Sequence, residues 1–413
     1  PAGVFHVMTR AATHRRVIFV NRYYWPDALA TAQMLTDLAE GLAERGWKVT
    51  VIASHDGNAG APVRESRRGV EILRGRSLRR GRHGLMAKAG AYFTFTFSAR
   101  RLLRRHLQAN DWLVAMTDPP ILAPFAATAA RRAGARLVHW LQDIHPEIGL
   151  ALSNSRLLEI LSRPWVRRRD AAWQCAHACV AISQDMAALV GQHGLAANQI
   201  RIIPNWAPGG ELLAPVPAEQ NPLRRTWNLA GKFVVAYSGN LGRVHALEPV
   251  LAAAARLRHE AGLVFLFLGE GPRRPALEAQ ARAEGLTNVR FLPPQPQARL
   301  GESLSAGDVH LVTLQAGCER YVFPSKLYGI LAVARPIIFI GPTHCELAEA
   351  VRRHGAGLAV DGSDPAALAS AIRDLMHDAP RGAAMGQAAR HWSQATGGRQ
   401  AALDAWEMVL RTD

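Results

Sequence analysis

The sequence predicts an α/β protein built from two successive domains, each with a parallel sheet. From Arg16 onward, short apolar runs alternate with helix-length amphipathic segments, which is the pattern of parallel βαβ units. Near the middle, the stretch Trp206–Pro222 is rich in proline and glycine and interrupts this alternation, as a linker between domains does. The length of 413 residues also exceeds that of one ordinary domain and suits two.

The first half begins with a complete βαβ unit. A strand over Val17–Asn21 precedes a helix over Ala30–Arg45, and a second strand follows over Lys48–Ala53. Gly46 comes directly after the helix, where glycine often ends one because it adopts the left-handed conformation at low cost. Further strands are expected over Gly69–Gly75, Trp112–Thr117, Ala135–Asp143, Ala178–Ser183 and Ile200–Asn205.

The second half repeats the alternation after the linker. Its strands are expected over Lys232–Gly239, Leu263–Gly269, Val289–Pro293, Val309–Leu314, Pro336–Gly341 and Gly357–Asp361, and closing helices over Pro365–His377 and Arg399–Leu410. The predicted domains are a flexible extension over 1–15, a Rossmann-like domain over 16–208, a linker over 209–222, a second Rossmann-like domain over 223–390, and a segment over 391–413 whose helix can pack back on the first domain.

Composition indicates a folded protein, and its excess positive charge fits either an anionic partner or the base composition of the genome. Hydrophobic residues make up 49% and charged residues 20% of the chain, a balance that excludes a disordered protein. Lysine and arginine outnumber aspartate and glutamate by 49 to 33, which favours nucleic acid, acidic lipid or a phosphorylated substrate as partner. The 4 cysteines form no CxxC pair, so we expect a reducing cytoplasmic setting and no metal site.

Functional residues should follow strands, because open parallel sheets bind ligands beyond the carboxyl ends of their strands, here in a cleft between the two domains. The junction Tyr237–His245 is the first example in the second half. Gly239 lets the backbone approach a ligand, next to Asn240, and Arg243 and His245 are candidate contacts for a diphosphate. A plain glycine turn is the alternative interpretation.

Three later junctions share this character. Their candidate donor-binding residues are Gly269, Glu270, Gly271, Leu292, Pro293, Pro324, Ser325, Lys326 and Tyr328. Ser325 is placed to cap a helix whose amides, with the Lys326 ammonium, would form an anion site. Tight turns and strand ends explain the glycines and prolines without a ligand.

In order and spacing, the motifs SGNLGR, LGEGP, VRFLPP, GDVHLV and PSKLYGILAVARPII resemble those of the retaining glycosyltransferases of family 4. The likeness is greatest to the branch that builds colanic acid and O-antigen polysaccharide. The first half agrees through YYWPDALATAQMLTDLAEGLAERGWKVTVIAS, WLQDIHPEIGLAL, AISQDMAALVGQHG and IRIIPNW. The resemblance covers residues 16–395.

This resemblance implies a GT-B architecture with a nucleotide-sugar donor on the second domain and no required metal or other cofactor. The donor would be a UDP-sugar, with a GDP-sugar as the alternative, and the enzyme a hexosyl- or N-acetylhexosaminyltransferase. Positive side chains would stabilise the departing nucleoside diphosphate. By position, Arg243 or His245 and Lys326 are the candidates.

The sequence departs from the family pattern at two places. Many members carry an E-x7-E pair whose second glutamate holds the donor ribose, but Tyr321 and Gly329 occupy these positions here, and Glu319 is out of register. The turn after the first strand often carries paired glycines, and here it reads Ala30–Ala32. The ribose contact therefore has no assigned residue, and close backbone approach in the first domain is not supported.

Acceptor-binding candidates follow two strands of the first half. They are Tyr24, Trp25, Asp27 and Thr31 after one strand, and His145 and Glu147 after the other. Asp143 is the first choice for orienting or deprotonating an acceptor hydroxyl, with His145 and Glu147 as alternatives. Asp143, Arg243 and Lys326 form the predicted catalytic set. Aromatic packing at a domain edge accounts equally well for the two aromatic residues.

A basic aromatic segment predicts contact with an anionic membrane. Between Arg64 and Arg105 there are 13 arginine and lysine residues against only Glu65 and Glu71, around the apolar run AGAYFTFTFSA. Arg79, Arg80 and Arg82 belong to its basic part. We expect an enzyme peripheral at the inner face of the cytoplasmic membrane. A core helix with a solvated flank is the alternative, and nucleic acid is not expected because no binding module accompanies the charge.

The sequence thus predicts a transferase that extends a lipid-linked or polysaccharide acceptor. A soluble tailoring glycosyltransferase acting on a small molecule and a sugar-nucleotide epimerase of the same architecture are the main alternatives. A nucleotide-binding or nucleic-acid-binding protein without turnover is a further one.

Overall fold

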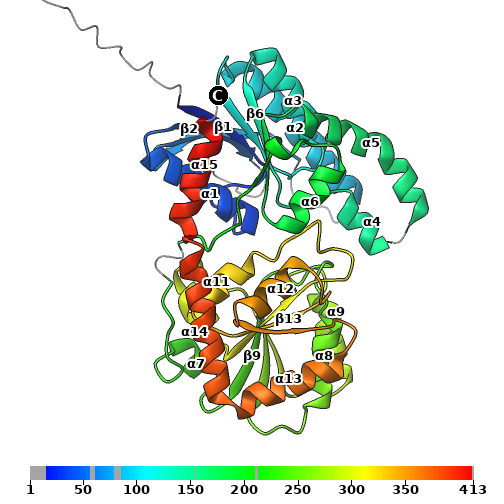
Figure 1. Cartoon of the computed structure of the whole chain (residues 1–413), viewed down its shortest axis with the longest axis vertical. Helices are drawn as coiled ribbons and strands as arrows, with labels where there is room; N and C mark the ends of the chain where they lie inside the picture. The colour runs from blue at the N-terminus through cyan, green and yellow to red at the C-terminus, as the bar shows by residue number, and fades with distance from the viewer. Residues whose placement is uncertain (1–14, 56–60, 79–84, 154, 210–212, 412–413) are drawn as a thin grey trace, which may run out of the picture. The chain divides into compact units, whose positions relative to one another are not determined.

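A computed structural model describes residues 15–55, 61–78, 85–153, 155–209 and 213–411. Arg79, Arg80 and Arg82 lie outside the described residues. The chain forms two sheets with helices on their faces (Figure 1). This is the α/β class with parallel sheets that the alternation of apolar runs and amphipathic segments predicts.

The first sheet is eight-stranded and has the order β3-β4-β2-β1-β5-β6-β7-β8. Its strands are β1 (Arg16–Val20), β2 (Lys48–Ser54), β3 (Arg64–Arg67), β4 (Val70–Gly75), β5 (Trp112–Ala115), β6 (Arg136–Trp140), β7 (Ala178–Ala181) and β8 (Ile200–Ile202). The pairs β2–β4, β1–β2, β1–β5 and β5–β6 are parallel, whereas β3 runs antiparallel to β4, with Arg64 opposite Leu73. The sequence analysis missed β3 because its four residues, RESR, contain no apolar side chain.

The second sheet is six-stranded and has the order β11-β10-β9-β12-β13-β14. Its strands are β9 (Phe233–Ser238), β10 (Leu263–Leu268), β11 (Val289–Leu292), β12 (Val309–Thr313), β13 (Ile337–Ile340) and β14 (Gly357–Val360), and every pair is parallel. Each expected strand of both halves is present. Most are shortened by one to a few residues at their ends, whereas β1 lies one residue earlier than expected and β2 ends one residue later.

Helices connect the strands and cover the sheets. They are α1 (Ala30–Glu44), α2 (Leu85–His106), α3 (Leu122–Ala133), α4 (Glu147–Ser153), α5 (Arg156–Gln174), α6 (Gln184–Gln192), α7 (Pro222–Thr226), α8 (Glu248–Arg256), α9 (Arg274–Ala283), α10 (Leu300–Ser305), α11 (Lys326–Ala332), α12 (Glu346–Arg353), α13 (Pro365–His377), α14 (Ala379–Ala395) and α15 (Gly398–Arg411). The sequence analysis did not anticipate α14 as a separate helix.

The core of the second half shows why its strands read as continuous apolar runs. In β13, Ile338 and Ile340 enter the core under α8, α9 and α13, whereas Ile337 and Phe339 enter the core under α10, α11, α12 and α14. Successive side chains of a strand point to opposite faces, and both faces of this sheet are covered. Every residue of the strand is therefore buried and apolar.

The chain divides into two compact units. One comprises Pro1–Trp140, Ala171–Cys179 and Trp406–Asp413, and the other comprises Leu141–Asp170 and Val180–Ala405. Within the first unit, Trp406 of α15 packs edge-to-face on Trp140 with ring centroids 5.0 Å apart. Trp47 also donates a hydrogen bond from Nε1 to Glu407 at 2.8 Å.

Both sheets reverse their strand order at their first strand. In the second sheet the chain runs outward from β9 through β10 to β11, and then returns to place β12 on the other side of β9. β1 has the same place between β2 and β5 in the first sheet. Parallel sheets bind ligands at the carboxyl ends of the strands on either side of such a switch point. The ends of β9 and β12 are therefore the first place to look for a site.

Candidate functional site

Three segments converge at the switch point of the second sheet. Tyr237 lies at the end of β9 and Gly239 directly follows the strand. Nδ1 of His245 lies 2.8 Å from the carbonyl oxygen of Thr313, the last residue of β12. Lys326, the first residue of α11, extends its side chain to the same place, with Nζ 3.5 Å from the centroid of the Tyr237 ring. A Cβ atom on Gly239 would lie only 3.2 Å from that Nζ, so glycine leaves the space that the ammonium group occupies.

The Lys326 ammonium is buried without a hydrogen-bond partner among the described residues. Burial lowers the pKa of Lys326 well below its usual value, because the charged form loses its hydration. The face of the Tyr237 ring attracts the cation by about 1 to 2 kcal/mol. Removing an ammonium from water costs several kcal/mol, so the ring offsets only part of that cost. No hydrogen bond from the described residues offsets the rest.

His245 enters the site as a neutral imidazole. The residue is buried, and burial followed by the nearby Lys326 charge lowers its pKa to about 3. Because the Thr313 carbonyl can only accept, Nδ1 carries the proton. His245 is therefore not one of the positive charges that the sequence analysis considered for the diphosphate.

The predicted glycine turns pack against one another. A Cβ atom on Gly269 would lie 2.0 Å from the carbonyl oxygen of Gly239, and one on Gly271 would lie 2.5 Å from that of Leu241. The Leu241 amide also donates to the Glu270 carbonyl at 2.9 Å. Loop packing alone thus requires these two glycines, and it fixes the position of the loop that carries Asn240.

The remaining candidates near these turns lie at the surface. Glu270 is exposed, and its carboxylate pairs with Arg274 at 2.6 Å. The Leu292 carbonyl accepts from the Gly269 amide at 3.1 Å, and Pro293 after it is exposed. Asn240 is exposed as well. These residues form the outer rim of the loops rather than their packed interior.

Two arginines add positive charge beside the turns. Arg243 is exposed and makes no hydrogen bond or ion pair among the described residues. Arg273, which precedes α9, donates to Glu248 at 3.0 Å. Burial and then the Arg243 charge lower the pKa of Arg273, so the two guanidinium groups influence one another. The sequence analysis missed Arg273, although its place directly after the turn at Gly271 was the available signal.

A cavity of about 460 Å³ lies at the carboxyl ends of β12, β13 and β14. Its lining comprises Ala246, Glu248, Pro249, Leu314, Gln315, Ala316, Gly341, Pro342, Asp361, Gly362 and Ser363. Ala246 directly follows His245, and the Gln315 amide donates to the Val244 carbonyl at 2.8 Å. The cavity therefore adjoins the loop that holds His245.

The start of α11 differs from the sequence prediction in one respect. Ser325 is the N-cap residue, but its side chain makes no capping hydrogen bond. Its backbone is already helical, with φ −60° and ψ −22°, whereas a capping serine adopts an extended conformation. Pro324, which precedes Ser325, is buried. Tyr328 in the first turn of the helix has a raised pKa because its hydroxyl is buried.

The second position of the missing glutamate pair, Gly329, and the out-of-register Glu319 have different surroundings. A Cβ atom on Gly329 would lie 3.0 Å from Cδ1 of Leu304, so the helix packs closely there. Glu319, by contrast, has a buried carboxylate oxygen, Oε2, without a hydrogen-bond partner among the described residues. The charge of the Glu319 carboxylate is opposite in sign to that of the Lys326 ammonium.

The acceptor candidates after β1 are mostly packed. Tyr24 is 1% exposed, and burial raises the pKa of its hydroxyl. The Arg67 guanidinium lies over the Trp25 ring at 4.4 Å from the centroid. Asp27 donates its backbone amide to the Tyr24 carbonyl, and Thr31 is half-buried in the first turn of α1. Packing therefore accounts for the Tyr24 ring, whereas its buried hydroxyl has no hydrogen-bond partner among the described residues.

Sequence reasoning missed the residues that stand at the switch point of the first sheet. Arg22 follows β1 and lies 5.1 Å and 5.3 Å from the ring centroids of Tyr23 and Tyr92. Its amide donates to the Asp118 carbonyl after β5 at 2.8 Å. The signal was available, because both residues directly follow apolar strand runs.

The candidates after β6 divide into two groups. Glu147 accepts a hydrogen bond from the buried Arg169 at 2.6 Å, and the same Arg169 nitrogen donates to the His145 carbonyl at 2.9 Å. This ion pair accounts for Glu147, which makes it a poor general base. Asp143 and the His145 side chain are half-buried and stay as predictions.

The described part of the chain holds neither a cluster of metal ligands nor a helix that could span a membrane. Three or more histidine, cysteine, aspartate or glutamate side chains never gather there in a way that would hold a metal ion. None of the helices in those residues combines the length and the apolar character that crossing a bilayer requires.

Models of two protein families match the chain. Residues 30–206 match the glycosyl transferase 4-like domain, and residues 219–392 match the glycosyl transferases group 1. Together the two matches span most of both halves and meet at the proline-rich linker.

Two curated relatives are also described as glycosyltransferases. The chain is 30% identical to the colanic acid biosynthesis glycosyl transferase WcaI of Escherichia coli K12, over 64% of this chain and 66% of that protein. It is 27% identical to the glycosyltransferase WbjE of Pseudomonas aeruginosa, over 70% of this chain and 71% of that protein. The matches thus span about two thirds of the length of these relatives.

Solved structures share the fold. Sucrose-phosphate synthase from Thermosynechococcus elongatus has a TM-score of 0.78 at 18% identity, covering 96% of this chain and 98% of that one. Anabaena HepE in complex with UDP and glucose has a TM-score of 0.75 at 18% identity, covering 97% of this chain and 100% of that one. With the family matches, the strand order and the motifs in register, the chain belongs to the glycosyltransferases of family 4 and is an enzyme of the GT-B fold.

Proposed function

We propose that the enzyme transfers a sugar from a nucleotide-sugar donor, with retention, to a lipid-linked or polysaccharide acceptor. The names of its relatives support this reading, because WcaI is described as a colanic acid biosynthesis enzyme. WaaG, a structural neighbour with a TM-score of 0.70, is described as involved in lipopolysaccharide biosynthesis. A UDP-sugar is the proposed donor, since HepE was solved with UDP and with UDP-glucose. A GDP-sugar is the alternative.

The observation that carries the proposal is the buried, unpartnered ammonium group of Lys326 at the switch point. A nucleoside diphosphate would bring a negative charge to this ammonium group. The same charge grows on the leaving group as the glycosidic bond breaks, so Lys326 stabilises the transition state more than the ground state. Arg243, exposed at the rim, adds a second positive charge for the diphosphate.

Glu319 is the proposed contact for a donor hydroxyl. Its buried Oε2 has no partner among the described residues, and a sugar or ribose hydroxyl can donate to it. This role would replace the carboxylate that Gly329 cannot supply. Asp143 is the proposed group that orients the acceptor hydroxyl or accepts its proton.

Metal independence is part of the proposal. Lys326 and Arg243 can meet the leaving charge that a divalent ion meets in other transferases. Transfer should therefore survive saturating chelator. Complete inhibition that added magnesium reverses would contradict this part.

Contact with an anionic membrane at the inner face is proposed through α2. Phe93 and Phe97 are 65% and 71% exposed and lie one helical turn apart. Arg101 and Arg104 are exposed one and two turns further on. An aromatic face that continues into arginines suits the boundary between lipid tails and phosphates. A soluble tailoring enzyme would not need such a face, so an absence of vesicle binding would favour that alternative.

The central test is the binding of UDP and GDP, measured by thermal shift and by titration calorimetry. A nucleotide that binds the folded state raises its melting temperature. Lys326→Met removes the charge but keeps a side chain of similar length over the Tyr237 ring. We expect this variant to lose at least tenfold in affinity for the preferred nucleotide, whereas Lys48→Met, at an exposed lysine, should bind normally. Equal affinity of the Lys326 variant and the wild type would refute the proposed donor site.

A further inference from the structure

Helix α5 exposes an apolar surface that no residue of the donor site explains. Leu157, Leu158, Ile160 and Leu161 are 65%, 50%, 56% and 66% exposed. Scattered exposed leucines are normal in proteins, but four large aliphatic side chains within five consecutive positions form a contiguous patch. We call these four residues the α5 ridge.

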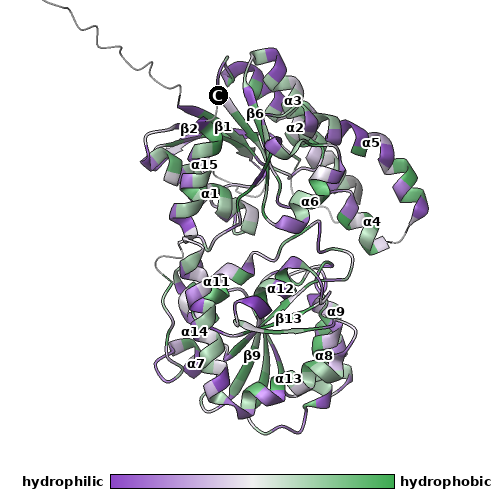
Figure 2. Cartoon of the chain, in the orientation of Figure 1, coloured by the Kyte–Doolittle hydropathy of each residue, from purple (hydrophilic) through white to green (hydrophobic). Residues whose placement is uncertain are grey.

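The ridge occupies one side of the helix. At about 100° per residue, the four side chains span an arc of about 160° around the helix axis. Glu159 and Arg163 lie on the opposite side, where they form an ion pair at 3.0 Å. Trp165, half-buried one turn beyond Leu161, continues the apolar arc. Figure 2 shows the corresponding alternation of hydrophobic and hydrophilic segments along α5.

Arginines without acidic partners border the ridge. Arg156, Arg167 and Arg168 are exposed, and none of them makes an ion pair among the described residues. Glu159 is the one exposed carboxylate of α5, and Arg163 already neutralises it. The chemistry around the ridge is therefore apolar in the centre and positive at the edges.

This combination selects the partner. A second copy of the chain would have to set an acidic rim against these arginines, yet this strongly basic chain carries a formal charge of +16. A bilayer that contains acidic phospholipids offers both requirements at once, with acyl chains for the leucines and phosphates for the guanidinium groups. Long arginine side chains reach the phosphates while their stems stay beside the apolar arc. Tryptophan also favours the same boundary.

We propose that the α5 ridge inserts into the headgroup boundary of an acidic membrane and anchors the enzyme there. The inference rests on the membrane-bound acceptor of the proposed function and adds a second, physically different contact. Binding through α2 combines two exposed aromatic side chains with arginines, and salt weakens the arginine part. The ridge adds four aliphatic side chains to a rim of arginines, and salt does not screen the burial of the aliphatic side chains.

The test uses the full chain and two kinds of vesicle, phosphatidylcholine alone and phosphatidylcholine with phosphatidylglycerol. Leu158→Asp combined with Leu161→Asp places two charges on the ridge without touching the core. Loss of two buried leucines corresponds to about 100-fold weaker partition onto the acidic vesicles. The loss should persist at high salt. Met408→Asp, at a residue that is 68% exposed outside both the ridge and the basic segment, is the control and should bind as the wild type does.

Depth is measured independently of affinity. In a Cys175→Ser background, which removes the exposed cysteine, Leu161→Cys can carry an environment-sensitive fluorophore. A blue shift on acidic vesicles, with quenching by brominated acyl chains, is expected. A fluorophore that stays in water while the protein binds would overturn the proposal.

The outcomes separate this inference from the proposed function. UDP affinity and transfer to a soluble acceptor should stay unchanged in the double variant, because no ridge residue belongs to the donor site. If the wild type binds acidic vesicles and the double variant binds them equally well, the ridge proposal alone fails. If the wild type binds no vesicles, the membrane part of the proposed function fails with it. A wild-type dimer that becomes monomeric in the double variant would assign the ridge to a protein interface and also overturn the proposal.

Discussion

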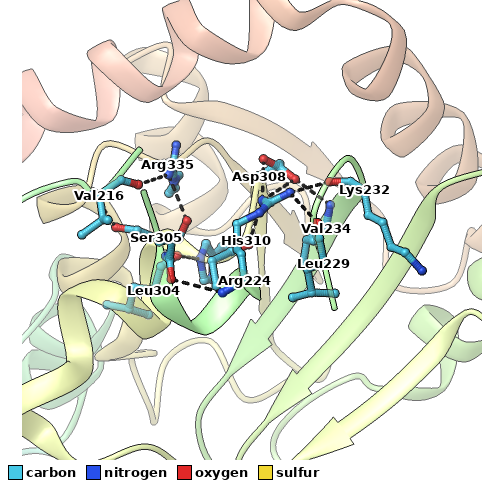
Figure 3. Close-up of polar contacts among 12 residues, drawn as sticks. Val216, Arg224, Leu229, Lys232, Val234, Leu304, Ser305, Asp308, His310 and Arg335 are labelled. Carbon is cyan, nitrogen blue, oxygen red and sulfur yellow. Dashed lines mark hydrogen bonds and ion pairs between the residues drawn. The ribbon is translucent and has the colours of Figure 1, made fainter. Parts of the chain in front are cut away.

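In the second sheet, a buried cation lies near the amino ends of the strands and another near their carboxyl ends. The two cations have opposite surroundings. At the amino ends of β9 and β12, Arg224 donates to both carboxylate oxygens of Asp308 at 3.0 Å and to the Ala306 carbonyl at 3.0 Å (Figure 3). Its other nitrogen donates to the carbonyls of Leu229 and Lys232 at 3.3 Å and 2.5 Å. At the carboxyl ends, the Lys326 ammonium has no hydrogen bond among the described residues.

This difference separates structural charge from functional charge. A buried cation with a full set of acceptors holds the polypeptide together, because every group that lost water has gained a partner. A buried cation without acceptors costs stability, and a fold keeps it where a ligand supplies the partner. Four predictions test this contrast, in order of decreasing effect.

The largest effect should come from Arg224→Met. The substitution leaves the half-buried Asp308 beside the Val234 amide without its cation. Removing one partner of a fully buried pair costs about 3 to 5 kcal/mol of unfolding free energy, and the partial exposure of Asp308 places the expected loss near the lower end of this range. Chemical denaturation measures this loss. Arg225→Met, at the exposed neighbour on α7, should change stability by less than about 0.5 kcal/mol. UDP affinity of the folded Arg224 variant should equal that of the wild type.

Lys326→Met should show the reverse pattern. Transfer should fall about 100-fold or more, because one well-placed group that stabilises transition-state charge contributes about 3 kcal/mol. The unfolding free energy should not fall, since the substitution removes a buried charge that lacks a partner. Steady-state kinetics and denaturation on the same preparation check both. A loss of stability comparable to that of Arg224→Met would show that Lys326 is structural.

The sequence predicted the fold more completely than the site. Every strand with an apolar run was found, because a strand buried on both faces must be apolar at every position, whereas the polar β3 left no such signal. Lys326 was predicted as an anion contact from its place after Ser325. That its ammonium would lie over Tyr237 without a partner depends on the packing of three separate segments, which no local pattern encodes.

Two glycines and one histidine show the same limit of prediction from sequence. The Gly269 and Gly271 turns were read as room for a ligand, but their neighbours along the sheet require glycine for loop packing. His245 was considered as a positive contact, but its burial against Thr313 and Lys326 makes it neutral. In both cases the sequence gives the residue type at a strand end. The charge and the close contacts come from segments far away in the chain.

In the absence of nucleotide, a fall in pH should lower the unfolding free energy equally through two buried histidines, His310 and His245. Burial lowers the pKa of His310, beside the Arg224 network, to about 4 and that of His245 to about 3, from 6.5. Each histidine therefore contributes stability that is complete above pH 6.5 and is lost as the pH falls toward its folded pKa. Between pH 6.5 and 5, each should remove about 1 to 2 kcal/mol of unfolding free energy.

Matched variants separate the two histidines. His245→Asn retains a donor at the Nδ1 position, and His310→Gln retains one at Nε2, the nitrogen that lies 2.7 Å from the Leu304 carbonyl. Each should flatten the dependence of unfolding free energy on pH. Saturating UDP should flatten the wild-type dependence further, because the diphosphate charge raises the pKa of His245. UDP that flattens the profile of His245→Asn as strongly would contradict this placement of the diphosphate.

The smallest expected effect concerns Arg243, which is exposed near the carboxyl ends of the strands. Arg243→Ala should weaken UDP binding by about tenfold, the value of one charge-assisted hydrogen bond that solvent partly screens. The loss should shrink as salt rises, whereas the loss in Lys326→Met should change little with salt, because a buried charge is screened much less. Arg256→Ala, at an exposed arginine that ends α8, is the control and should bind UDP normally. If Arg243→Ala bound UDP as tightly as the wild type while Lys326→Met did not, the buried ammonium and the neighbouring backbone would hold the diphosphate. The exposed Arg243 would then have to act on another part of the donor.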